Sequence, residues 1–434
     1  MGDRDRALLA DLQKPRTFKQ LQQHPDLAAR LTALARLYLL AGPRSDARMA
    51  LQTGKDPQVR AQLLWPPGRQ PPHHGCVGTG TCCSASFLGP VFAADAQRVS
   101  ALQWPRKREK LFETVRFRGQ EVRGMARDDN GRCEAQGEDL LCAIHLAHGL
   151  PAKPVTCRQF PLRFHRSPDG VHVSLLLACD GYERARQAAQ PWPERAAEIH
   201  ALLAEGAAAP QLALPVTLSA GLPIAWPDWQ ALRAQFFAAE PATPQPREWL
   251  DRVLQLAEGA LVQRQAELAE GLEIAWQSDL HVLRAGLHAP SLLWPAPVRA
   301  DAIADLRAAA DTLTGARARD GLRLRQLADG LAHLAAELPL TDDARQHLHD
   351  IVANDLAAYV VVGELDAGLG NLTRRLLLAH GVAAALASQA GKPQIDAKDT
   401  TQALHVVYRS EPELTWLGTL QPRTLEVARP SGVP

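Results

Sequence analysis

Cysteine is missing from most of this chain, since residues 1–75 and 180–434 contain none. Long apolar runs are missing as well, because no stretch approaches the roughly 18 uninterrupted apolar residues that a membrane span needs. Neither sign of charge is in excess, and the formal net charge is +1. The composition therefore predicts no membrane span, gives no reason to expect nucleic acid or a membrane surface as a partner, and confines thiol chemistry to one segment.

The first sixteen residues, MGDRDRALLADLQKPR, are rich in charge and lack the apolar run of a secretory signal. We therefore expect a cytoplasmic protein. Thiols stay reduced in that compartment, and seven is an odd number of cysteines, so a complete disulfide framework is excluded. Two interpretations remain, in which the cysteines are metal or cluster ligands or are small buried core residues.

All seven cysteines are candidate ligands: Cys76, Cys82, Cys83, Cys133, Cys142, Cys157 and Cys179. Soft thiolates select zinc, copper(I) or iron–sulfur centres, and four of them suffice for one structural zinc or one [4Fe–4S] cluster. The number of cysteines and their departure from paired Cys-x-x-Cys spacing favour the iron–sulfur cluster over zinc. The sequence does not choose which four ligate.

Some of the candidates have competing interpretations. Cys82 and Cys83 are adjacent, which makes it awkward for both to face one ion, so one ligates while the other packs, or each serves a different metal. His145 and His148 are either additional ligands or surface residues. Arg158 follows Cys157 directly, and either hydrogen-bonds the cluster, clamps the loop, or forms a salt bridge that holds the turn.

The chain is predicted to be mainly α, with a small loop-rich metal-binding module that contains short β-strands. We expect an N-terminal helical segment over 1–65, the cysteine module over 66–185, a helical domain over 186–420 and a disordered tail over 421–434. Within the module, we expect one helix over Phe92–Trp104, strands around Val115–Met125 and Val171–Leu177, and a turn at Asp128–Gly131 that leads into Cys133. Such a module buries little apolar surface, and a metal would supply folding energy.

Leucine and alanine periodicity predicts the helices of the C-terminal region. One predicted face holds Leu250, Val253, Leu254, Ala257 and Leu261. Another holds Leu324, Leu327, Leu331, Leu334 and Leu338. The segment 338–342 is predicted to end that second helix, and Thr341 to cap the next one. In the N-terminal segment, Leu27, Leu31, Leu34 and Tyr38 recur at helical spacing.

The cysteine module contains, in this order, the segment Cys76–Cys83 and the elements Gly131-Arg-Cys133, Cys142-Ala-Ile144 and Cys157-Arg-Gln-Phe-Pro161. In these elements it resembles the YkgJ-type, zinc- or iron-chelating cysteine-cluster family, which includes flagellin lysine N-methylase. The family's CxxCxxCC motif is matched by Cys76, Cys82 and Cys83, with Thr79 in place of its second cysteine. Its later elements are matched by Gly131-Arg-Cys133, Cys142-Ala-Ile144 and Cys157-Arg-Gln-Phe-Pro161. The resemblance covers residues 75–185 and implies a bound metal. Threonine is a poor ligand for soft metals, so a metal site that uses the second position of the motif is altered or lost in this chain. His73, His74 or Cys179 could supply the missing ligand.

The methylase branch implies S-adenosylmethionine as a cofactor and a protein substrate such as a filament or surface protein. The only glycine-rich segment that suggests such a cofactor is Gly363–Asn371, and its helical surroundings favour a helix–turn–helix connection instead. The other role that the cysteines allow is non-enzymatic, with zinc as a staple in an interaction module.

The basic run Pro105–Lys110 is a solvated face or a contact for an acidic or nucleic-acid partner. No residue is singled out as catalytic.

Overall fold

The computed structural model describes most of the chain from residue 90 onward and a few earlier positions. The described residues are 7–8, 10, 24, 26–27, 29–31, 62–64, 80, 90–103, 110–117, 120–129, 131–177, 196–207, 209, 216–219, 222–269, 280–336, 338–358 and 365–410. The tail predicted over 421–434, and Leu34 and Tyr38 of the N-terminal stripe, lie outside them.

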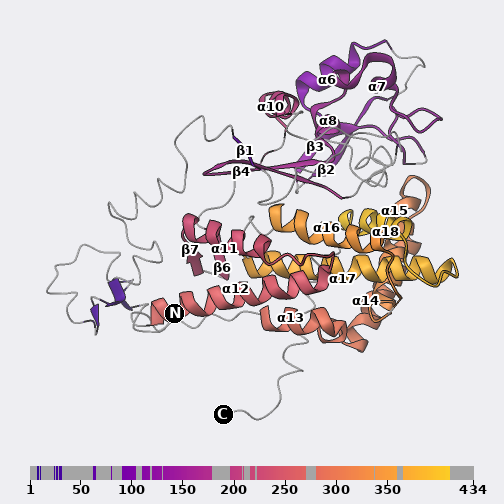
Figure 1. Ribbon diagram of the computed structural model, residues 1–434. Helices are drawn as coiled ribbons and strands as arrows, with labels where there is room; N and C mark the ends of the chain where they lie inside the picture. The colour runs from indigo at the N-terminus through magenta and orange to yellow at the C-terminus, as the bar shows by residue number, and fades with distance from the viewer. Residues whose placement is uncertain are drawn as a thin grey trace.

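Most of the described chain is helical, as predicted. The helices of the C-terminal region are α11 (Trp226–Ala238), α12 (Pro246–Ala269), α13 (Leu280–His288), α14 (Ala296–Asp311), α15 (Ala318–Ala332), α16 (Asp342–Ala358), α17 (Leu365–Gln389) and α18 (Ala397–Tyr408). They pack into one bundle, with α17 in contact with α12, α13, α15, α16 and α18 (Figure 1). None of these described helices combines the length and apolar character that a membrane crossing requires.

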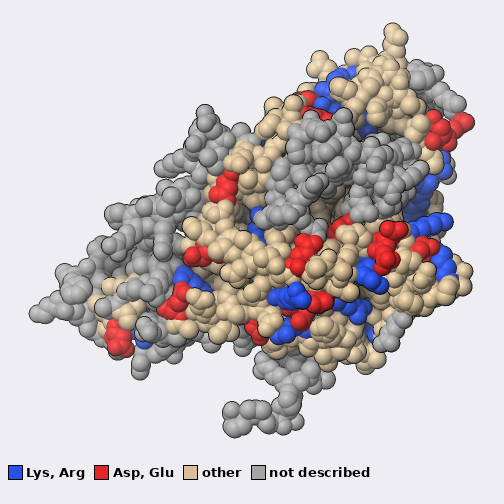
Figure 2. All heavy atoms as spheres, in the orientation of Figure 1, with Lys and Arg blue, Asp and Glu red and all other residues tan. Residues whose placement is uncertain are grey.

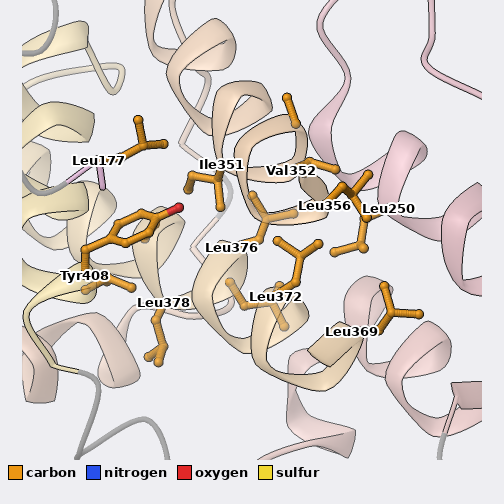
Figure 3. Packing of buried hydrophobic residues seen from close by; sticks show 14 of the residues in the cluster. Leu177, Leu250, Ile351, Val352, Leu356, Leu369, Leu372, Leu376, Leu378 and Tyr408 are labelled. Carbon is orange, nitrogen blue, oxygen red and sulfur yellow. The ribbon is translucent and has the colours of Figure 1, made fainter. Parts of the chain in front are cut away.

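The central position of α17 follows from its sequence, which is apolar on nearly every side. Figure 3 shows Leu369, Leu372 and Leu376 of α17 beside Leu250 of α12 and Leu356 of α16, all of them buried. Partners therefore surround this helix instead of covering one face. The predicted stripe on α12 is confirmed, because its five residues are at most 4 % exposed.

A pair of glycines lets α15 and α17 approach closely. A Cβ atom built on Gly381 would lie 2.3 Å from the carbonyl oxygen of Gly330, and one built on Gly330 would lie 2.4 Å from Val382 Cγ2. Real side chains do not tolerate such distances. The two helices can cross at this distance only because both positions lack a side chain.

The predicted start of α16 is confirmed, and the predicted end of the preceding helix is wrong. Thr341 Oγ1 accepts a hydrogen bond from the Ala344 N–H at 3.2 Å, as an N-cap does. The α15 helix ends at Ala332, whereas the leucine repeat continues to Leu338. Leu334 lies beyond the end of the helix and is only 1 % exposed. The leucine repeat therefore continues because the chain stays buried there, although it is no longer helical.

Three small sheets accompany the helices in the part of the chain that the structure describes. The strand β5 (Gly170–Leu175) pairs antiparallel with β4 (Leu162–Ser167) and parallel with β1 (Leu63–Leu64). The other sheets are antiparallel hairpins, formed by β2 (Phe112–Phe117) with β3 (Gln120–Met125) and by β6 (Val216–Ser219) with β7 (Leu222–Ile224). The strand predicted at Val171–Leu177 is therefore confirmed as β5, the strand predicted around Val115–Met125 is two strands of one hairpin, and β4 was not predicted.

The remaining helices are short and lie mostly around the cysteines. They are α6 (Ala93–Ser100), α7 (Ala143–His148), α8 (Val155–Gln159) and α10 (Ala196–Ala204), with 3₁₀ turns η2 (Leu150–Ala152), η4 (Pro290–Leu292) and η5 (Gly315–Arg317). The α6 helix confirms the helix predicted over Phe92–Trp104. The α7 and α8 helices correct the prediction that this was the only helical stretch among the cysteines.

Among the described residues, the buried apolar side chains form two separate clusters. The large core joins the helical bundle to β4, β5, α8 and α10. The small core is made of Val91, Ala96, Val99, Met125, Cys133, Ala135, Ile144 and Ala152. The elements of the small core, α6, α7 and the β2–β3 hairpin, lie together at one end of the molecule in Figure 1. Acidic and basic side chains are interspersed over the visible face of the bundle in Figure 2.

Candidate metal centre

The predicted turn before Cys133 is present and places this residue in the small core. The Gly131 N–H donates to the Asp128 carbonyl at 2.9 Å, and Gly131 has a φ of +73°. Asp128 Oδ1 accepts the Arg132 N–H at 2.8 Å. Asp and Gly are suited to such turns because Asp bonds the backbone and Gly tolerates positive φ. Beyond the turn, Cys133 pairs with Arg127 and is only 7 % exposed.

Cys133 and Cys142 lie at the two ends of a closed loop. The Gln136 N–H donates to the Cys133 carbonyl, and the Ala143 N–H donates to the Ala135 carbonyl, both at 2.8 Å. Cys142 is half-buried immediately before α7 and packs against the small core that contains Cys133. The local backbone therefore brings these two predicted ligands to the same small core.

A glutamine side chain ties the first cysteine segment to this loop. Gln136 Nε2 donates to the Gly80 carbonyl at 2.9 Å and to the Leu140 carbonyl at 2.8 Å. Gly80 belongs to the segment Cys76–Cys83 and has a φ of +70°. A Cβ atom at Gly80 would lie 2.0 Å from the Leu140 carbonyl oxygen, so only glycine fits there. Gly80 thus fixes one point of the first segment against the Cys133–Cys142 loop.

Cys157 lies on α8, which α6 and the chain before it hold in place. Asp95, which is 4 % exposed, accepts the Val155 N–H at 3.0 Å through Oδ2. Thr156 Oγ1 donates to the Pro90 carbonyl at 2.7 Å. Cys157 itself is half-buried and belongs to neither apolar cluster.

The structure favours the salt-bridge and clamp interpretations of Arg158. Its Nη1 donates to Glu205 Oε1 at 3.0 Å, its Nη2 also bonds the Glu205 carboxylate, and its Nε donates to the Lys153 carbonyl at 3.1 Å. The hydrogen bond from Arg158 is the largest influence on Glu205 and lowers the pKa of that carboxyl. Arg158 therefore links α8 to the end of α10.

The two histidines differ in environment. His148 is exposed and its Nε2 lies 2.9 Å from the Gln103 carbonyl oxygen. His145 is half-buried, and burial, with a smaller contribution from the charge of Lys153, lowers its pKa. A lowered pKa keeps the imidazole neutral, which is the form that binds metals.

The structure describes Cys133, Cys142 and Cys157, whereas Cys76, Cys82, Cys83 and Cys179 lie outside the described residues, as do Thr79, His73 and His74. Among the described residues, no three of the His, Cys, Asp and Glu side chains come close enough together to hold a metal ion. Cys133 and Cys142 thus share a core, but Cys157 does not complete a three-residue group with them. The donor set fits a soft metal, because both residues supply thiols, of which that of Cys133 is buried and that of Cys142 is half-buried.

Two residues that position these cysteines were not predicted. Gln136 and Asp95 bond the backbone at Gly80 and Val155, respectively. No spacing rule singles out a glutamine, since its role depends on a carbonyl 56 residues away. Asp95 lies in the first turn of α6, where an acidic residue is ordinary for helix stability.

The segment that could have been a cofactor loop is largely helical. Residues Leu365–Asn371 form the first turns of α17, and Gly368 and Gly370 are buried there. The helical surroundings are as expected, but the described residues of this segment begin α17 and do not form the connection that was predicted. The basic run Pro105–Lys110 lies outside the described residues except for Lys110.

Comparisons with known proteins found no match among protein-family models, curated proteins or solved structures.

Proposed function

We propose that this chain is a metal-binding protein whose cysteines hold an iron–sulfur cluster or zinc. One observation carries the proposal. Gln136, in the loop between Cys133 and Cys142, donates a hydrogen bond to the carbonyl of Gly80, which belongs to the Cys76–Cys83 segment. Two of the predicted ligands lie in one small core, and Gly80, which is close in sequence to three more, is hydrogen-bonded to the loop that joins them.

The chemistry of the small core supports this function. Its described part contains only eight buried apolar residues, and so few contribute little hydrophobic stabilisation. Metal–thiolate bonds would add folding energy where apolar burial is scarce. A four-thiolate site that includes Cys133 and Cys142 needs two more thiols, which Cys76, Cys82, Cys83, Cys157 and Cys179 could supply. An iron–sulfur cluster remains our preferred occupant, since the cysteines are numerous.

Anaerobic purification followed by metal analysis and a visible absorption spectrum tests the proposal. Brown protein with a broad band near ~400 nm and about four irons and four sulfides per chain would establish a [4Fe–4S] protein. Colourless protein with about one zinc would establish a structural site. Protein with less than about a tenth of an equivalent of either metal, purified in folded form, would contradict the proposal.

The ligand assignment is tested with Cys142→Ser, which should lose most of the metal. Ala143→Ser is the matched control, because it adds a hydroxyl group at the neighbouring position and leaves every thiol in place. Cys157→Ser is expected to lose metal as well, and Cys179→Ser to have a milder effect. Equal metal content in the wild type and Cys142→Ser would remove Cys142 from the site.

The roles built on this site remain predictions. A methylase would transfer a methyl group from S-adenosylmethionine to lysines of a filament or surface protein, whereas a zinc staple would support an interaction module. Calorimetry of the metal-loaded chain with S-adenosylmethionine separates them. Heat of binding and a rise in melting temperature would favour the methylase, and the absence of both would favour the staple.

A further inference from the structure

The turn of the β4–β5 hairpin rests on one face of α11. Asp169, in the turn, accepts a hydrogen bond from Trp226 Nε1 at 2.8 Å through Oδ2, and the same oxygen accepts one from Gln230 Nε2. Trp226, Gln230 and Arg233 are four and three residues apart, so they lie along one face of the helix. Arg233 therefore lies on the helix face that the hairpin covers, about one turn after Gln230.

Arg233 is buried without a complete set of hydrogen bonds. Only 9 % of the residue is exposed, and its guanidinium carbon lies 5.5 Å from the centre of the Phe237 ring. Its Nε and Nη2 atoms are both buried and have no acceptor among the residues that the structure describes. These N–H groups occupy one edge of the planar guanidinium and donate in parallel, in the geometry that matches two oxygens of a carboxylate or phosphate.

The nearby carboxylate does not satisfy that edge. Asp169 raises the pKa of Arg233, but burial is the larger influence and lowers this pKa to about 10. The side chain remains cationic at neutral pH. A buried charge without a hydrogen-bonded counterion is costly, by several kcal/mol in typical proteins. A water molecule could accept the N–H groups but would leave the charge uncompensated.

A histidine beside Arg233 offers one more polar atom. His172 on β5 is 5 % exposed, and its Nε2 lies 3.0 Å from Ser167 Oγ. Burial, followed by the charges of Arg233 and His165, lowers the pKa of His172 to about 3, so the ring is neutral. Its Nδ1 has no partner among the described residues. The Ser167 hydroxyl donates either to the Gly170 carbonyl at 3.3 Å or, when turned, to His172 Nε2. In the second arrangement the ring proton is on Nδ1, which is then a donor, and an oxyanion at Nδ1 selects that tautomer.

We propose that Arg233 and His172 form a binding site for a small oxyanion, either a carboxylate or a phosphate group. Two oxygens accept the parallel N–H groups of Arg233, and His172 Nδ1 donates to the same group. Of the two side chains that meet at the hairpin turn, Gln230 is exposed and Asp169 is half-exposed. It involves none of the cysteines, so it stands independently of the proposed metal centre.

The test is calorimetry and thermal unfolding of the full chain at neutral pH, with sodium phosphate or sodium acetate compared with sodium chloride at equal ionic strength. The wild type should show a saturable heat and a saturable rise in melting temperature. A response to both anions indicates recognition of two oxygens alone, and a response to phosphate alone assigns the site to phosphoryl groups. Equal melting temperatures in all three salts, without heat, would overturn the proposal.

Variants separate this site from general salt effects. Arg233→Met should abolish the response, and Arg233→Lys should weaken binding about tenfold or more, or at least about 1.4 kcal/mol, because lysine keeps the charge and loses the parallel donors. Arg325→Met is the matched control, since Arg325 is half-exposed and paired with Asp311. A response retained in Arg233→Met, or lost in Arg325→Met, would contradict the assignment.

Two further variants keep the test decisive if Arg233→Met fails to fold. Asp169→Asn removes the competing carboxylate and should strengthen anion binding. His172→Gln removes the Nδ1 donor at the sheet and should weaken it. If Asp169→Asn weakens binding and His172→Gln leaves it unchanged, the oxyanion site does not exist as proposed.

Discussion

The two apolar cores of this protein are held together by different means. The large core surrounds α17 with helices on several sides, and contains tryptophans, phenylalanines and many leucines. The described part of the small core has one large aliphatic side chain, Ile144, with Met125, two valines, three alanines and Cys133. Hydrophobic burial scales with apolar area, so the first core is stabilised by packing and the second depends more on specific bonds.

The specific bonds of the small core are local and polar. They include the turn at Asp128–Gly131, the closed loop between Cys133 and Cys142, and the Gln136 contacts with Gly80 and Leu140. The large core also contains polar side chains, but there they are enclosed by packing. The comparison predicts that substitutions in the large core will change the free energy of unfolding, and that substitutions in the small core will change the metal content.

The largest expected effect is in the large core, at a buried ion pair. Arg375 on α17 bonds Asp355, both are at most 1 % exposed, and Tyr408 Oη donates to Asp355 Oδ1 at 2.8 Å. Asp355→Ala leaves the guanidinium buried without its counterion, and should lower the free energy of unfolding by about 3–5 kcal/mol. Denaturant unfolding followed by circular dichroism measures this loss.

Tyr408→Phe is the graded control for this prediction. It removes one hydrogen bond to the same carboxylate and should cost about 1–2 kcal/mol. Both variants should keep the metal content of the protein that remains folded. If Asp355→Ala cost less than Tyr408→Phe, the ion pair would not stabilise the large core.

The next effect is expected in the small core. Gly80→Ala combines the strain of a left-handed backbone, about 1–2 kcal/mol, with a contact of 2.0 Å to the Leu140 carbonyl oxygen. We expect metal content to fall by about half or more, since the first cysteine segment loses its anchor. The helical melting transition should stay within a few degrees of the wild type.

Gly391→Ala is the matched control. Gly391 has a φ of +64°, and no atom lies within 4 Å of the Cβ position there. This variant has the backbone strain without the close contact, so it should keep its metal. Equal metal loss in both variants would show that strain in general, and not the contact with Leu140, is responsible.

A smaller effect should appear as a pH dependence of the large core. His380 on α17 has a pKa lowered to about 4 by burial and then by the charge of Arg247. The unfolded histidine, with a pKa of 6.5, binds a proton first as the pH falls. Stability is therefore complete above pH 6.5 and declines between 6.5 and about 4, by up to about 1.4 kcal/mol per pH unit.

His380→Gln removes this contribution, so the difference in unfolding free energy between wild type and variant should shrink or reverse as the pH falls through that range. His148→Gln, at an exposed position on α7 and outside the large core, is the matched control substitution. A wild-type profile parallel to that of His380→Gln from pH 6.5 to 4 would rule out His380 as the source.

The sequence predicted the large core better than the small one. The stripe on α12 and the cap at Thr341 were predicted because periodicity and capping depend on neighbouring residues. The strand β4 was not predicted, although Leu162 and Phe164 alternate with polar residues as strands do. The leucine repeat overran the end of α15 because a turn can bury leucines at similar intervals.

The candidate site could be predicted only as a set of thiols. Cysteine positions are visible in the sequence, but the shared core of Cys133 and Cys142 depends on backbone pairing between Ala135 and Ala143. The anchoring of Gly80 by Gln136 is a contact between distant parts of the chain. Neither follows from spacing alone, because both depend on how the loop closes.

The smallest expected effect is at Arg158, which bonds the Lys153 carbonyl, next to Ala152 of the small core, and Glu205, at the end of α10 in the large core. Arg158→Ala should lower the free energy of unfolding by about 1 kcal/mol, since the Glu205 side chain is 41 % exposed and partly solvated. Glu205→Gln should have a similar effect, and the double variant should cost no more than either single one. Thermal unfolding and metal analysis of the three variants are compared with the wild type. Because Arg158 bonds a carboxylate and a backbone carbonyl, metal content should not change. Metal loss in Arg158→Ala but not in Glu205→Gln would instead mean that Arg158 acts on the cysteines directly, and that the two cores are coupled through the metal centre.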